Sequence, residues 1–183
     1  MSLDLGKKFL SQKNFKDAEK IFLDLNKNNN NFEINYNLAI INFELKNIKK
    51  SLKFFDKCKK IDPKSLNTYL KVAYLEQSTG DIEKSLSTYL KVLDINIRDI
   101  RAYYGIFTLN PNFLKTSHFE IIKQINDNPN ANILEKFLSK FLLSKKEKKE
   151  RNFEKELAFL NNSHSLCFDF KKEYNLQSQK YYS

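Results

Sequence analysis

One pattern of small and large side chains recurs in the first half of the chain and limits the folds that it can adopt. Three successive segments each carry two small residues, followed one helical turn later by an aromatic ring. These residues are Gly6, Ala18 and Phe22, then Ala39, Ser51 and Phe55, then Ala73, Ser85 and Tyr89. Every member shifts by 33 residues from the first segment to the second and by 34 from the second to the third. A fixed period of this length indicates a stacked repeat.

The small positions suit two helices that cross closely, because only small side chains let the helix axes approach each other. The aromatic ring after the second small position then fills the space between the helices. An ordinary bundle of amphipathic helices would also place apolar residues every 3.6 positions, but it would not repeat small and large positions at one period. We therefore expect each repeat to be a pair of packed helices.

Stop signals divide these segments into six helices. The expected ranges are 2–12, 15–28, 33–45, 48–60, 66–79 and 82–95. The asparagine run at 28–31 ends the first pair, and Asp62-Pro63 ends the second because proline cannot continue a helix. Gly80 suits a left-handed helix stop between the two helices of the third pair.

The repeat resembles the tetratricopeptide repeat, a helix–turn–helix unit of about 34 residues. The first repeat matches the pattern of that family at Leu5-Gly6, Phe9, Ala18 and Phe22. Asn42 and Glu76 depart from it, because the family usually has an aromatic residue at these positions, and we expect Phe43 and Leu75 to fill the gaps. The resemblance implies an all-α fold, a right-handed superhelical solenoid of helix hairpins.

Three such repeats are expected over residues 1–97, with bounds near 1–31, 32–64 and 65–97. Residues 98–183 are expected to form degenerate repeat-like helices and a capping helix, continuous with the same solenoid, because terminal repeats must face water on one side.

Within this second part, the expected helices are one around Ala102–Phe107 that ends early at Pro111, one over 118–125 and one over 133–148. Phe153, Leu157 and Leu160 mark a partner helix, which gives a fifth repeat with Ser144 and Glu156 at its two small positions. A last helix is expected from Leu166 to about Tyr182.

The composition excludes several kinds of chemistry. With only 3 Gly, 2 His and 2 Cys, the chain has neither a glycine-rich phosphate loop nor the spacing of a zinc site. Cys58 and Cys167 are interpreted as small core residues. His164 stands one helical turn from Cys167, and we interpret the two as residues of a terminal helix and its approach. We expect no enzyme, no cofactor and no metal.

The chain is basic, with 32 Lys+Arg against 22 Asp+Glu and a net charge of +10. Only Arg98, Arg101 and Arg151 are arginines, whose planar fork nucleic-acid readers usually exploit, so we do not expect a nucleic-acid partner. The lysine-rich run at 145–151 is interpreted as a solvated helix end, with an anion or nucleic-acid contact as the alternative. The sequence contains no apolar stretch long enough to span a membrane and no apolar signal at its start, which favours a soluble, cytoplasmic protein.

The family resemblance implies that the first helices of the repeats line a concave groove that binds a peptide or a partner protein. Asn37 and Lys71 fall at two positions of the clamp with which some members hold a C-terminal carboxylate, whereas Leu3, Lys7 and Leu75 do not match the other three. Our candidate groove residues are Tyr36, Asn37, Lys71 and Tyr74. The expected partner is a protein or peptide, acidic or carrying a carboxylate. The oligomeric state stays open.

A second resemblance gives an alternative function. Segments 141–144, 152–155 and 163–166 look like the last repeats ahead of bacterial sulfotransferase domains. The chain would then be the recognition arm of a sulfotransferase-like or other transferase whose catalytic domain is absent from this sequence, because the phosphate-binding loop that such a domain needs is missing.

Overall fold

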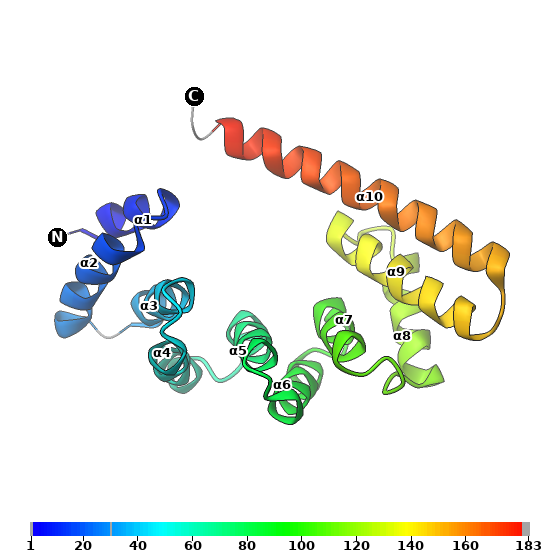
Figure 1. Ribbon diagram of the computed structural model, residues 1–183, viewed down its shortest axis with the longest axis horizontal. Coiled ribbons are helices and arrows are strands. Elements are labelled where there is room, and N and C mark those ends of the chain that lie inside the picture. The colour runs from blue at the N-terminus through cyan, green and yellow to red at the C-terminus, as the bar shows by residue number, and fades with distance from the viewer. Residues whose placement is uncertain (1, 30, 181–183) are drawn as a thin grey trace. The chain divides into compact units, whose positions relative to one another are not determined.

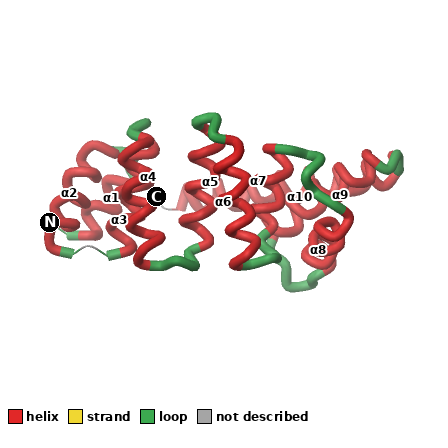
Figure 2. The backbone as a smooth tube through the Cα atoms, turned by 90° about the horizontal axis from the view of Figure 1, so that it is seen from below, coloured by secondary structure: helices red, strands yellow, loops and turns green. Residues whose placement is uncertain are grey.

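The computed structural model describes residues 2–29 and 31–180. Over these ranges the chain forms helices and no strands (Figure 2). The helices are α1 (Leu3–Ser11), α2 (Phe15–Asn28), α3 (Phe32–Glu44), α4 (Ile48–Ile61), α5 (Leu66–Ser78), α6 (Ile82–Ile95), α7 (Ile100–Leu109), α8 (Thr116–Asp127), α9 (Ile133–Lys149) and α10 (Phe153–Lys180) (Figure 1). They divide into two compact units, Met1–Ile95 and Asn96–Ser183.

The first unit consists of three helix hairpins in a row. Helix α1 packs against α2, α3 against α4 and α5 against α6, while α2 and α4 also contact the first helix of the hairpin that follows (Figure 1). All six helices begin and end within one residue of the predicted ranges. The period therefore predicted these hairpins correctly, and the fold is that of an all-α helical-repeat solenoid.

The small positions of the pattern are all buried, as predicted. Gly6 packs against Phe22 so closely that a Cβ atom at Gly6 would lie 3.0 Å from the ring. In the next two hairpins, serine hydroxyls join the paired helices: Ser51 Oγ donates to the carbonyl oxygen of Ala39 at 2.7 Å. In the third hairpin, Ser85 Oγ donates to the carbonyl oxygen of Ala73 at 2.8 Å. The aromatic residues Phe22, Phe55 and Tyr89 fill the adjacent space and are buried.

The turn inside each hairpin is built in one way. The residue two positions before the second helix has a left-handed backbone, with a φ of 57° at Lys13, 62° at Lys46 and 84° at Gly80. The next backbone N–H then donates to a carbonyl five residues earlier, as from Asn47 to Asn42 at 2.8 Å. The bond satisfies a carbonyl that the end of the helix would otherwise leave free.

The same turn joins α9 to α10 in the second unit. Arg151 has a φ of 62°, and the backbone N–H of Asn152 donates to the carbonyl oxygen of Glu147 at 2.9 Å. Ser144, at the first small position of this hairpin, is fully buried, whereas Glu156 at the second is half-buried. The α9–α10 pair is thus a further hairpin of the same design.

The two residues that depart from the family pattern are accommodated by hydrogen bonds. Asn42 is fully buried, and its Nδ2 donates to the carbonyl oxygen of Leu38 at 2.9 Å. Glu76 accepts a hydrogen bond from Thr88 Oγ1 at 2.7 Å. Leu75 is a buried member of the neighbouring apolar cluster, against which the half-buried Phe43 packs, so these two side chains supply the apolar surface as predicted.

The second unit is organised around α9, which contacts α7, α8 and α10. The prediction of two separate helices after residue 153 was wrong, since α10 runs without a break from Phe153 to Lys180. The polar segment 161–165 contains no Gly or Pro, and its residues lower helix propensity only slightly. Moreover, Ser163 is buried and its Oγ donates to the carbonyl oxygen of Phe137 on α9 at 3.1 Å. Tyr182, the expected end, lies outside the described residues.

Candidate functional site

Two of the candidate groove residues occupy equivalent positions in successive repeats. Asn37 lies on α3 and is half-buried, and Lys71 lies on α5, 34 residues later, and is exposed. Among the described residues, no carboxylate pairs with Lys71. One turn further along α5, the side chain of Tyr74 is 53% exposed.

The fourth candidate, Tyr36, is held by packing. Its ring stacks on Phe32 with centroids 5.7 Å apart and meets Phe55 edge-on at 5.8 Å. It is half-buried against the apolar cluster of Ala39, Phe55, Val72 and Leu75. Tyr36 is therefore held largely by the core, and only part of its side chain is exposed.

Side-chain packing links α3 to α5 at the exposed tyrosine. The rings of Phe43 and Tyr74 meet edge-on with centroids 5.9 Å apart, and the ammonium group of Lys46 lies 5.6 Å from the Phe43 ring. Sequence reasoning missed Phe43 and Lys46 as surface residues, because it considered Phe43 only as a replacement for a missing core ring. We call the set of Asn37, Phe43, Lys71 and Tyr74 the α3–α5 surface.

One ion pair lies close in sequence to this surface. Lys7 of α1 contacts Glu33 of α3 at 2.6 Å, and the hydrogen bond to Glu33 raises the pKa of the lysine. The charge of Glu33 is thereby balanced within the protein. Lys71, by contrast, can attract an acidic ligand.

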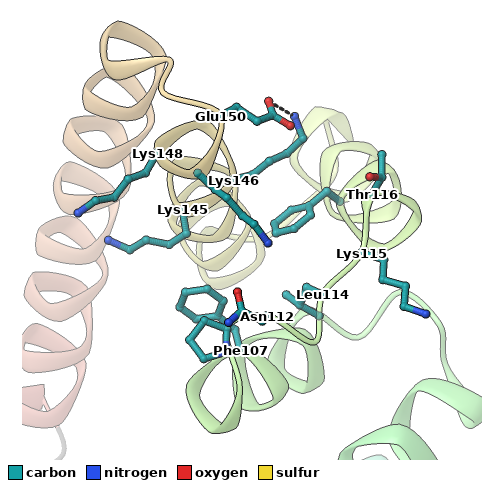
Figure 3. A pocket seen from close by; sticks show the side chains of 12 residues that line it. Phe107, Asn112, Leu114, Lys115, Thr116, Lys145, Lys146, Lys148 and Glu150 are labelled. Atoms are coloured by element: carbon teal, nitrogen blue, oxygen red, sulfur yellow. Dashed lines mark hydrogen bonds and ion pairs between the residues drawn. The ribbon is translucent and has the colours of Figure 1, made fainter.

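A second candidate site lies in the second unit. A pocket of about 830 Å³ is formed by the end of α7, the connection to α8, the start of α8 and the last turns of α9 (Figure 3). Its apolar lining comes from Phe107, Pro111, Leu114 and Phe119. Lysines line it as well: Lys115, Lys145, Lys146, Lys148 and Lys149. We call it the lysine pocket.

The lysines of this pocket differ in their partners. Lys146 contacts Glu150 at 2.8 Å and Glu147 at 3.7 Å, and the hydrogen bond to Glu150 is the main reason why its pKa is raised. Lys145 lies over the Phe141 ring, 4.9 Å from its centroid. Sequence reasoning identified the lysine run at 145–151 but not the pocket, because the apolar residues that line it lie about 30 positions earlier.

Thiol and metal chemistry receive no support from the described residues. Cys58 is fully buried, as predicted, and burial raises the pKa of its thiol to about 11, which keeps it protonated and unreactive. Cys167, which was also predicted to be a core residue, is only half-buried, and His164 is exposed on the same helix. No group of three His, Cys, Asp or Glu side chains in the described part could hold a metal ion. None of the described helices is both long and apolar enough to cross a bilayer.

Comparisons with known proteins agree with this architecture. Residues 32–65, which comprise α3, α4 and their turn, match the family model of the tetratricopeptide repeat. No curated protein sequence matches the chain. Among solved structures, the crystal structure of MamA is similar, with 12% identity, a TM-score of 0.66 and coverage of 94% of this chain and 99% of that one.

The MamA RS-1 ArsTM double mutant is similar at 14% identity and a TM-score of 0.64, with 91% and 92% of the two chains covered. At such identities the likeness concerns the fold. The period, the hairpins with their shared turn and the family match nevertheless agree, and they identify residues 32–65 as a tetratricopeptide repeat within an all-α helical-repeat solenoid.

Proposed function

We propose that the chain is a non-catalytic scaffold that binds a short acidic or carboxylate-bearing peptide of a partner protein on its α3–α5 surface. The fold and the family match support a protein-interaction scaffold in general terms. The choice of surface and ligand rests on the residues of α3 and α5.

The observation that carries the proposal is the combination of an exposed cation and an exposed ring one turn apart on α5. Lys71 has no carboxylate partner among the described residues, and Tyr74 is 53% exposed beside Phe43. A ring supplies contact area at a low cost in side-chain entropy, and an unpaired ammonium group favours an acidic segment.

Asn37 adds a different capability at the equivalent position of the preceding repeat. Its amide can both donate to and accept from a peptide backbone, which suits a ligand in an extended conformation. Because neither Asn37 nor Lys71 belongs to the buried core, both can be replaced with little effect on folding.

The test starts from peptides selected out of a random dodecapeptide library on the full chain carrying Lys148→Gln and Lys149→Gln, which impairs the lysine pocket. The selected peptide is then titrated by fluorescence anisotropy. We expect an acidic sequence, at least tenfold weaker binding to the Asn37→Ala/Lys71→Ala variant, and weaker binding at higher salt.

The control is Lys53→Ala, which removes one exposed lysine from α4, and it should change the affinity less than twofold. The proposal would be contradicted if the Asn37→Ala/Lys71→Ala variant bound the peptide as tightly as the protein with an unchanged α3–α5 surface. Selection of peptides without acidic residues would contradict it as well.

A further inference from the structure

We propose that the lysine pocket of the second unit is an independent binding site for an acidic protein segment that carries one bulky apolar side chain. The proposal does not rest on the α3–α5 surface, because all residues of the pocket lie in α7, α8, α9 and the connection between α7 and α8.

The lysine pocket has an apolar part. Leu114 is buried, Phe107 and Phe119 are half-buried, and all three contribute to a cavity of about 830 Å³. Figure 3 shows Phe107, Asn112 and Leu114 on one side of the pocket and the side chains of α9 on the other. A cavity of this size, with apolar residues in its lining, accommodates a large side chain together with flanking backbone.

The lysine pocket also carries more positive than negative charge. Of the five lysines in the pocket, only Lys146 has a carboxylate partner among the described residues. Lys145, Lys148 and Lys149 on the last turns of α9 therefore leave a local excess of positive charge beside the apolar lining. Such a combination favours an anionic ligand over a neutral one and attracts it from a distance.

Contacts between aromatic rings hold part of the pocket in place. The Phe141 ring beneath the Lys145 ammonium group also meets Phe107 edge-on, with centroids 6.1 Å apart, and Tyr104 at 5.8 Å. These contacts fix the ring on which the lysine rests, so that Lys145 is held near the apolar lining. In Figure 3 Lys145 and Lys148 extend in the same direction, whereas Lys115 points away from α9.

The residues of the pocket favour a peptide over a nucleic acid. The cations are lysines and not the arginines that read phosphates and bases with a planar fork. A single hollow with an apolar lining suits one anchoring side chain, whereas a polynucleotide needs a continuous basic groove with stacking rings. An acidic peptide with an aromatic or large aliphatic anchor satisfies both parts of the pocket.

The experiment uses the full chain carrying Asn37→Ala and Lys71→Ala, so that the other proposed surface cannot contribute. A random dodecapeptide library is selected on this protein, and the enriched peptide is titrated by fluorescence anisotropy. We expect net negative peptides with a conserved bulky apolar residue. Adding Lys148→Gln and Lys149→Gln should weaken binding at least tenfold.

Two controls are needed. One tests whether the position of the lost lysines matters or only their charge, and the other tests whether the apolar side chain of the peptide contributes to binding. The pair Lys49→Gln and Lys53→Gln removes the same charge from exposed positions of α4 and should change the affinity less than twofold. Replacing the apolar residue of the peptide by alanine should weaken binding at least tenfold. This second control leaves the protein unchanged and therefore does not depend on the folding of a variant.

Three results would overturn the proposal: selection of peptides without acidic residues, equal loss of binding in the pocket and α4 variants, or no effect of the alanine replacement in the peptide. A single-stranded oligothymidylate that binds more tightly than the peptide, and loses binding in the pocket variant, would overturn it as well and would assign the pocket to nucleic acid.

Discussion

Ser51 donates a hydrogen bond of 2.7 Å from its hydroxyl to the carbonyl oxygen of Ala39, where both residues are fully buried. Ser85 and Ala73 repeat the relationship in the next hairpin at 2.8 Å. The first hairpin has Gly6 and Ala18 at the same positions and thus has no hydroxyl there. The small positions of the repeat therefore do more than allow close approach, because in two of three hairpins they also join the helices.

Replacing Ser51 by alanine should lower the free energy of unfolding by about 1 kcal/mol, since the variant loses a buried hydrogen bond but leaves no cavity. The carbonyl oxygen of Ala39 loses only the bond from Ser51, because it remains part of the backbone of α3. Urea unfolding followed by circular dichroism measures the change, with Ser87→Ala on the exposed side of α6 as the control. Equal stability of Ser51→Ala and Ser87→Ala would show that the bond contributes nothing.

A larger side chain at a small position should destabilise the hairpin by overfilling the space between its helices. Ala73 is fully buried against α6, so leucine at this position must push the helices apart, at a cost on the order of 1–3 kcal/mol. Ala158→Leu, on the exposed surface of α10, is the matched control. If thermal unfolding gives the same midpoint for both variants, the assignment of small positions is wrong.

At the left-handed turn positions, removing a glycine should lower the stability of the chain, and introducing one should raise it. Gly80 has a φ of 84° and open space where a Cβ would lie, so Gly80→Ala should cost about 1–2 kcal/mol through backbone strain alone. Lys13→Gly should stabilise the chain, by less, because Lys13 is exposed and has a φ of 57°, whereas glycine also raises the entropy of the unfolded state. Chemical denaturation measures the stability of both variants, and a loss of stability in Lys13→Gly would contradict this account of the turn.

His118 makes the stability depend on pH. The backbone N–H of Lys115 donates to His118 Nδ1 at 3.0 Å, and burial, with a smaller effect of Lys115, lowers the pKa of the imidazole. The unfolded chain then binds the proton more readily, so the contribution of His118 is fully present above a pH of about 6.5 and is lost as the pH falls through the lower pKa of the folded state.

His118→Gln keeps an acceptor for the same N–H and cannot be protonated. Between pH 7.5 and 5.5 the wild-type melting temperature should therefore fall more than that of the variant. Parallel pH profiles for the two proteins would show that His118 does not contribute.

The sequence was sufficient to predict the first unit because small and aromatic positions recur at one period, and each recurrence supports the others. The turns at Lys13, Lys46 and Arg151 could not be recognised individually, because lysine and arginine do not favour a left-handed backbone. The continuity of α10 was also missed, since a polar run such as 161–165 can end a helix or lie inside one. The resemblance of the tail to sulfotransferase arms and the continuity of one solenoid over residues 98–183 stay predictions.

The candidate sites were less predictable than the fold. Lys71 and Tyr74 could be placed on an exposed helix face from the period alone, but the half-buried ring of Tyr36 depends on its packing against Phe32 and Phe55. The lysine pocket depends on contacts between residues 107–119 and 145–150, which no local pattern connects.

The central claim is that a partner peptide binds the α3–α5 surface, and amide chemical shifts test it most directly. The ¹⁵N-labelled full chain is titrated with the acidic peptide selected on the Lys148→Gln/Lys149→Gln protein. We predict that the largest shift changes occur at Asn37, Lys71 and Tyr74 and disappear in the Asn37→Ala/Lys71→Ala variant. Changes that leave α3 and α5 unaffected, or that persist unchanged in that variant, would contradict the account.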